Sequence, residues 1–106
     1  MLEWLEKWYK SQCNNEWEHN FGIKIETIDN PGWTLSIDLE DTEHNLNMVN
    51  WSQFGDFDKR WVGFKIEKNV YYASSDPENL NTLIYIFKEF IEKGDIDENE
   101  INNKLK

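Results

Sequence analysis

The sequence predicts an α+β domain in which a single antiparallel sheet of four to five strands carries an N-terminal and a C-terminal helix on one face. Two observations support this fold class. Helical spacing of apolar residues occurs near both ends of the chain, whereas strand-like alternation interrupted by turn residues occurs only between them. The opposite face of such a sheet is left for solvent or a partner.

Residues 2–12, LEWLEKWYKSQ, have the spacing of an amphipathic helix. At 100° per residue the apolar side chains occupy one arc of about 160°. They are Leu2, Trp4, Leu5, Trp8 and Tyr9. We expect this apolar stripe to pack on the sheet.

Residues 21–40 predict a β-hairpin, because apolar and polar residues alternate on both sides of Asp29-Asn30-Pro31-Gly32. Pro31 presets φ near −65° and Gly32 accepts a positive φ, so the pair predicts a type II turn. One face of the hairpin is apolar and needs covering. The other face is acidic.

The middle of the chain predicts further strands over residues 46–54, 60–67 and 70–74. Lys68-Asn69 suits a tight turn between the last two, because asparagine tolerates the left-handed conformation. Gly63 interrupts an apolar strand, which indicates a bulge or a close backbone approach.

The second helix is predicted to start after Asp76, which is a good N-cap, with Pro77 at the first helical position. Apolar residues at helical spacing follow over residues 80–91, and Gly94 is a suitable C-terminal stop. Residues 95–106 are charged and rich in asparagine, so we expect a short helix or a mobile tail.

The 106 residues have a net charge of −10 and suit one domain. Residues 21–50 alone carry a net −5, with one lysine against six acids. An acidic surface repels nucleic acid and anionic membranes and favours a basic protein partner, although acidic domains that bind nothing in particular are common. Because Cys13 is alone and no apolar run could span a membrane, we expect a cytoplasmic protein.

No motif for catalysis, nucleotide binding or metal binding stands out. Cys13 with His19 or His44 lacks the glycine-rich elbow and the third orienting group of a nucleophilic site, and one cysteine with two histidines falls short of a zinc site. A carboxylate pair such as Asp38 and Glu40 is more typical of a solvated face. The sequence therefore predicts no catalytic residue, no metal site and no cofactor.

The six tryptophans divide into two groups. Trp4, Trp8 and Trp33 lie, like Phe87, on predicted inward faces. Periodicity does not decide the direction of Trp17, Trp51 and Trp61. Each of these three is either part of the core or an exposed aromatic beside carboxylates, as at protein-binding hot spots.

The N-terminal third carries a long ordered string. It runs from Trp8 and Gln12-Cys13-Asn14 through Trp17-Glu18-His19 to Gly22-Ile23-Lys24-Ile25-Glu26-Thr27-Ile28-Asp29-Asn30-Pro31-Gly32-Trp33, and Asp76-Pro77, Asn79-Leu80 and an apolar helix follow much later. With this string the chain resembles the immunity protein 53 family of bacterial polymorphic toxin systems over nearly its whole length. Residues 70–75 depart from the resemblance, because they contain fewer glycines than expected before Asp-Pro.

The resemblance implies a small cytoplasmic antidote, without enzyme activity, that binds the catalytic domain of a cognate toxin. It implies an immunity-protein-like domain over residues 1–94, with 95–106 as the charged C-terminal segment. The acidic charge of the chain suits a basic toxin such as a nuclease, whose substrate groove must attract phosphate. The sequence alone sets no oligomeric state.

We expect the solvent-exposed acidic face of the hairpin and the loop before it to form much of the toxin-binding surface. The residues are Glu16, Trp17, Glu18, Glu26, Asp38 and Glu40. Two alternatives remain open at this point: a small cytoplasmic enzyme that uses Cys13 or a carboxylate pair, and an adaptor in a larger assembly.

Overall fold

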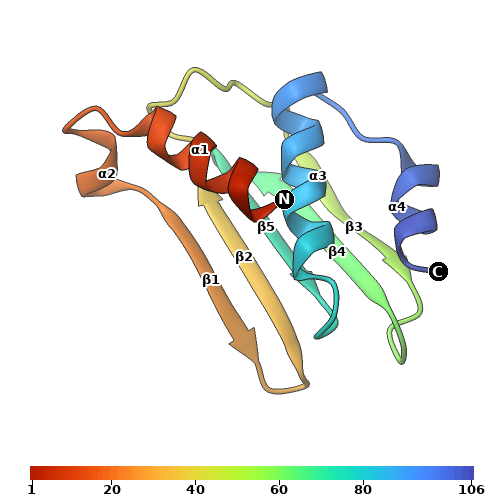
Figure 1. Ribbon diagram of the computed structural model, residues 1–106. Coiled ribbons are helices and arrows are strands. Elements are labelled where there is room, and N and C mark those ends of the chain that lie inside the picture. Colours follow the sequence, from red (N-terminus) through yellow and green to blue (C-terminus); the bar gives the residue numbers. More distant parts are fainter.

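The computed structural model describes residues 1–106 and has helices at both ends of a five-stranded sheet (Figure 1). The elements are α1 (Leu2–Gln12), α2 (Trp17–Asn20), β1 (Ile23–Ile28), β2 (Gly32–Asp38), β3 (Val49–Gly55), β4 (Trp61–Glu67), β5 (Val70–Ser75), α3 (Leu80–Lys93) and α4 (Glu98–Lys104). The strands are antiparallel in the order β1-β2-β5-β4-β3. This confirms the predicted fold class.

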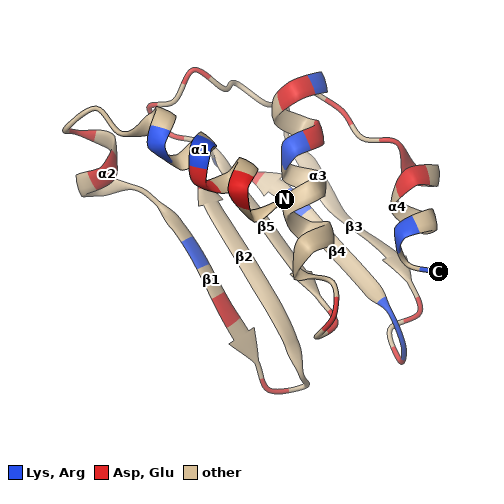
Figure 2. Cartoon of the chain, in the orientation of Figure 1, with Lys and Arg blue, Asp and Glu red and all other residues tan.

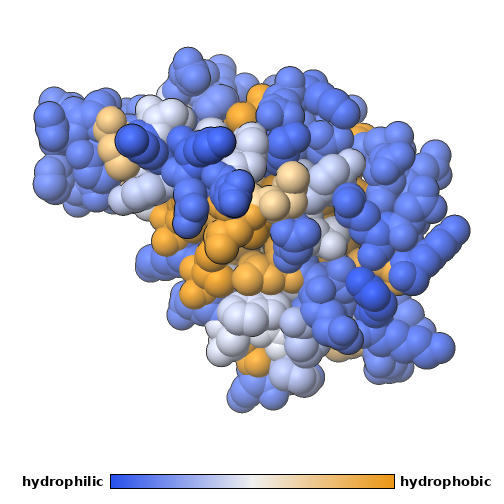
Figure 3. All heavy atoms as spheres, in the orientation of Figure 1, coloured by the Kyte–Doolittle hydropathy of each residue, from blue (hydrophilic) through white to orange (hydrophobic).

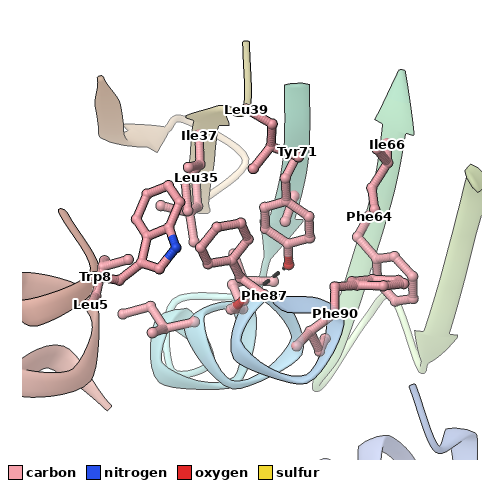
Figure 4. Close-up of a cluster of buried hydrophobic side chains, with 14 of the residues drawn as sticks. Leu5, Trp8, Leu35, Ile37, Leu39, Phe64, Ile66, Tyr71, Phe87 and Phe90 are labelled. Carbon is pink, nitrogen blue, oxygen red and sulfur yellow. Dashed lines mark hydrogen bonds between the residues drawn. The ribbon is translucent and has the colours of Figure 1, made fainter. Parts of the chain in front are cut away.

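The core lies between the sheet and the helices that cover one of its faces (Figures 1 and 4). Phe87 of α3 is fully buried at its centre, with its ring edge-on to Trp8 of α1 and tilted against Tyr71 of β5. The Tyr71 hydroxyl donates a 2.9 Å hydrogen bond to the carbonyl oxygen of Leu83, so the one polar atom of this side chain is satisfied. α1 and α3 therefore share a single apolar core with the sheet.

The predicted stripe of α1 is only partly covered. Leu5 and Trp8 are buried, but Trp4 is half-buried and both Leu2 and Tyr9 are exposed. Among the other residues predicted to point inward, Trp33 is half-buried, and its indole N–H donates to the carbonyl oxygen of Pro77 at 2.9 Å. α1 therefore packs mainly against α3 and enters the core through Leu5 and Trp8.

The β1–β2 hairpin is confirmed, but the predicted type II turn is wrong. The connection consists of Asp29, Asn30 and Pro31, and Gly32 is already the first residue of β2, with a φ that is not positive. A Cβ on Gly32 would overlap the backbone carbonyl oxygen of Ser75 in β5. The glycine is needed because two strand backbones approach each other closely, and not for its left-handed freedom.

Two other predictions of local conformation are confirmed. Lys68 and Asn69 connect β4 to β5 with φ values of 53° and 61°, the positive pair typical of a tight hairpin turn. Gly94 ends α3 in the left-handed conformation with φ of 76°. Both positions are set by short-range sequence.

The start of α3 differs from the prediction, because the helix begins at Leu80 and not at Pro77. The buried carboxylate of Asp76 accepts hydrogen bonds from the backbone N–H of Trp61 at 2.7 Å, the backbone N–H of Glu78 at 2.8 Å and the side-chain amide of Asn79 at 2.6 Å. It thereby ties β4 to the turn before α3. Asp76 is therefore a buried hydrogen-bond acceptor and not the N-cap of α3, which is Asn79.

α4 follows α3 and packs against α3 and β3. The carboxylate of Asp97 caps its first turn by accepting from the backbone N–H of Asn99, and Ile101 is fully buried. None of the four helices has the length and apolarity needed to cross a membrane.

Candidate functional site

Two acidic segments that are distant in the sequence meet at one corner of the molecule, near α2 (Figure 2). The indole N–H of Trp17 in α2 donates to the carbonyl oxygen of Glu40 at 3.1 Å. Gly22 and Asp38 exchange two further bonds, one from the Gly22 N–H to the Asp38 carboxylate at 2.9 Å and one from the Asp38 N–H to the Gly22 carbonyl at 3.1 Å. We define the acidic corner by the residues Glu16, Glu18, Asp38, Glu40, Asp41 and Glu43.

Trp17 lies beneath this corner and not on its surface. Its side chain is only 2% exposed, and its ring is edge-on to Trp8 at 6.0 Å and to Tyr9 at 5.9 Å. Trp17 therefore anchors α2 to α1, and we remove it from the candidate binding residues. The apolar surface of Trp17 is buried in the core and is not available to a partner.

Glu18 holds the loop between α1 and α2 in shape. Its two carboxylate oxygens accept from the backbone N–H groups of Asn14 and Asn15, each at 2.8 Å. Hydrogen bonding to the backbone of Glu18 itself and of these two residues lowers the pKa of the Glu18 carboxyl, because such bonds favour its charged form. The negative charge of Glu18 is thus both structural and permanent at neutral pH.

Glu40 and Asp38 are positioned by bonds of the same kind. One Glu40 carboxylate oxygen accepts from the side-chain amide of Asn69 at 2.8 Å, which links the corner to the β4–β5 turn. Asp38 is half-buried, whereas Glu16 is exposed. Side chains that internal bonds hold in place lose little conformational freedom when a partner binds.

Glu26 does not belong to this group. It faces Thr34 across the hairpin, in the half of β1 nearer the turn, and Lys24 lies between it and the corner (Figure 2). The structure therefore brings together Glu16, Glu18, Asp38 and Glu40, and leaves Glu26 apart.

The two segments that form the acidic corner, residues 13–23 and 38–58, contain no lysine or arginine to compensate their charge. Glu40, Asp41 and Glu43 are all exposed. A concentration of one charge sign attracts a partner of the opposite sign and speeds its association.

A second exposed feature lies on the sheet face that the helices leave open. The indole ring of Trp51 covers Gly63, where a Cβ would overlap the ring, and the Trp51 side chain remains 45% exposed. Trp61, in contrast, is buried and stacks on Phe57. The sequence left the direction of these tryptophans open; the signal for Trp51 was the glycine within a strand pattern.

The side chains of Cys13 and His44 both form hydrogen bonds within the fold. The Cys13 thiol donates to the carbonyl oxygen of Tyr9 at 3.4 Å, and the Nε2 atom of His44 accepts the indole N–H of Trp8 at 3.1 Å. The Nε2 atom of His44 thus has a hydrogen-bond partner on the core-facing side of α1 other than Cys13. No three His, Cys, Asp or Glu side chains gather in a group that could hold a metal ion.

The family model described as Immunity protein 53 matches residues 2–92. The chain belongs to the immunity protein 53 family. The immunity protein 53 match runs from α1 almost to the end of α3, so it includes all five strands and both segments of the acidic corner. Comparison with curated proteins and with solved structures found no match.

Proposed function

We propose that this member of the immunity protein 53 family binds a cognate bacterial toxin domain through the acidic corner, blocks it, and so protects the cell that produces both. The observation that carries the proposal is the acidic corner itself, where two segments without lysine or arginine are joined by the Trp17–Glu40 and Gly22–Asp38 hydrogen bonds. Family membership supports the class of function.

The chemistry of the corner favours a basic toxin. A nuclease, for example, needs a positively charged groove to attract phosphate groups, and such a groove also attracts carboxylates. Carboxylates seated there would exclude the phosphates of the substrate. Inhibition of this kind requires only occupancy, so the immunity protein needs no catalytic residue, and the cytoplasm of the producing cell is where it would act.

The test uses the cognate toxin domain, which would first be sought in the gene beside that of this chain, and measures the association rate at several salt concentrations. Glu16→Lys combined with Glu43→Lys reverses two charges of the corner. Asp29→Lys combined with Asp58→Lys makes the same change in net charge in the turns after β1 and β3, at the far end of the sheet. All four side chains are exposed, so both double variants should fold.

We expect the corner variant to associate about tenfold or more slowly and to lose most of its salt dependence, because steering by rim charges acts on the association rate. The matched control should change the rate much less. Equal effects of the two double variants would show that net charge matters and the corner does not. An unchanged rate in both would direct the search to the Trp51 face, with Trp51→Ala as the next variant.

A further inference from the structure

β1 forms an open edge of the sheet, since its only neighbour is β2 (Figure 1). The Gly22 carbonyl accepts from the Asp38 N–H, so alternate residues from Gly22 onward direct their backbone groups toward β2. The residues between them, Ile23, Ile25 and Thr27, direct their N–H and C=O groups toward the open edge. The register with β2 is continuous, without a bulge or a proline to protect that edge.

The helix-side surface next to this edge is apolar and uncovered. Ile25 is 40% exposed, and a hollow between α1 and β1 is lined by Leu5, Tyr9 and Ile23 among others. Figure 3 shows an apolar patch on this face beside α1. A strand added to β1 would cover part of this surface and would satisfy the free backbone groups.

We propose that the occupant is a second copy of this chain, with β1 pairing antiparallel to β1 across a two-fold axis at Ile25. Ile25 then faces Ile25 of the second copy. On the opposite sheet face, Lys24 lies directly across from Glu26 of the second copy, and the symmetry repeats this pair. The edge is therefore complementary to itself in charge.

Neighbouring registers lack this complementarity. An axis at Lys24 sets Lys24 against Lys24, and an axis at Glu26 sets Glu26 against Glu26, so both place like charges directly opposite. Axes at Ile23 or Thr27 set Lys24 against Gly22 or Glu26 against Ile28, which leaves the charges unpaired. Only the axis at Ile25 forms two ion pairs.

The backbone is compatible with this register, and the axis at Ile25 pairs all three outward-facing residues of β1. With the axis at Ile25, the outward-facing groups of Ile23, Ile25 and Thr27 meet those of Thr27, Ile25 and Ile23 of the second copy, and each residue pair exchanges two hydrogen bonds. The two five-stranded sheets become one continuous sheet. This pairing needs neither toxin nor the acidic corner, so it goes beyond the proposed function.

Sedimentation equilibrium of the isolated chain at physiological salt, up to about 1 mM protein, tests the pairing. We expect a reversible dimer. Lys24→Glu alone and Glu26→Lys alone each create like-charge pairs and should raise the dissociation constant at least about tenfold. The combined Lys24→Glu and Glu26→Lys variant restores opposite pairs and should restore the dimer.

Ile25→Pro is the backbone variant. It removes an N–H that points to the open edge and takes no part in bonding to β2, so an edge strand tolerates it. We expect a folded monomer, with folding checked by circular dichroism. The proposal is overturned by a wild-type monomer over the whole concentration range, by a dimer that survives Ile25→Pro, or by a charge swap that fails to restore association. A wild-type monomer whose toxin binding is lost in Ile25→Pro would assign the edge to the toxin instead.

Discussion

The backbone of β2 at Gly32 lies so close to β5 that a Cβ on this residue would overlap the carbonyl oxygen of Ser75. Trp33 and Ser75 are paired partners in the adjoining register. The contact holds the turn end of the β1–β2 hairpin against the centre of the sheet. It explains why glycine follows proline here although the φ of Gly32 is not positive.

Gly32→Ala should lower the free energy of unfolding by about 1–3 kcal/mol, because the methyl group meets backbone atoms that have little room to move. Gly22→Ala is the matched control, since nothing lies within 4 Å of a Cβ at that position. Its stability should be unchanged or raised by up to about 1 kcal/mol. Urea denaturation measures both, and equal losses would contradict the assigned contact.

Phe87→Ala should cost about 3–5 kcal/mol of unfolding free energy, because it leaves a cavity between α3, α1 and the sheet. Phe87 is 0% exposed and contacts the rings of Trp4, Trp8 and Tyr71. Leu2→Ala, at a side chain that is 57% exposed, should change stability by less than about 0.5 kcal/mol. A small effect at Phe87 would mean that α3 presents another face to the sheet.

Asp76→Asn should destabilise the protein by about 1–3 kcal/mol, because one oxygen becomes an amide group that faces hydrogen-bond donors. The donors are the backbone N–H groups of Trp61 and Glu78 and the side-chain amide of Asn79. Asp58→Asn, at an exposed side chain, provides the control. Thermal melting of the two variants checks the difference, and a stable Asp76→Asn protein would refute the assigned network.

Glu18→Gln should make stability less dependent on pH in acid. The Glu18 pKa is lower in the folded chain than in the unfolded one, so the stabilisation is present above the ordinary glutamate pKa of about 4.3 and is lost as pH falls through the folded value. Denaturant titrations between about pH 6 and pH 3 should show a shallower decline in the variant than in the wild type. Parallel declines would argue against the bonds to Asn14 and Asn15.

Much of the secondary structure was predictable because its signals act over short stretches. The apolar spacing of residues 2–12 and 80–91 identified α1 and α3, and alternation on both sides of Asp29-Asn30-Pro31-Gly32 identified β1 and β2. The positive φ values at Asn69 and Gly94 follow from residue types that tolerate them. Local preference and global fold agree at these places.

The candidate site was less predictable because its geometry depends on contacts between distant segments. Acidic residues were recognisable in the sequence, but their grouping depends on bonds such as Trp17 to Glu40, 23 residues apart. The same contacts put Trp17 inside the fold and leave Glu26 beyond Lys24. No local pattern encodes which of several acids share a corner.

The sequence by itself determined the α+β class, the helices α1 and α3, the β1–β2 and β4–β5 hairpins and the family, since periodicity, turn chemistry and an ordered motif string are properties of neighbouring residues. Only the tertiary structure decided what Gly32 and Asp76 are for and that Ile101 joins the core. The physical reason is that close backbone approach, buried hydrogen bonding and burial arise between segments that the fold brings together.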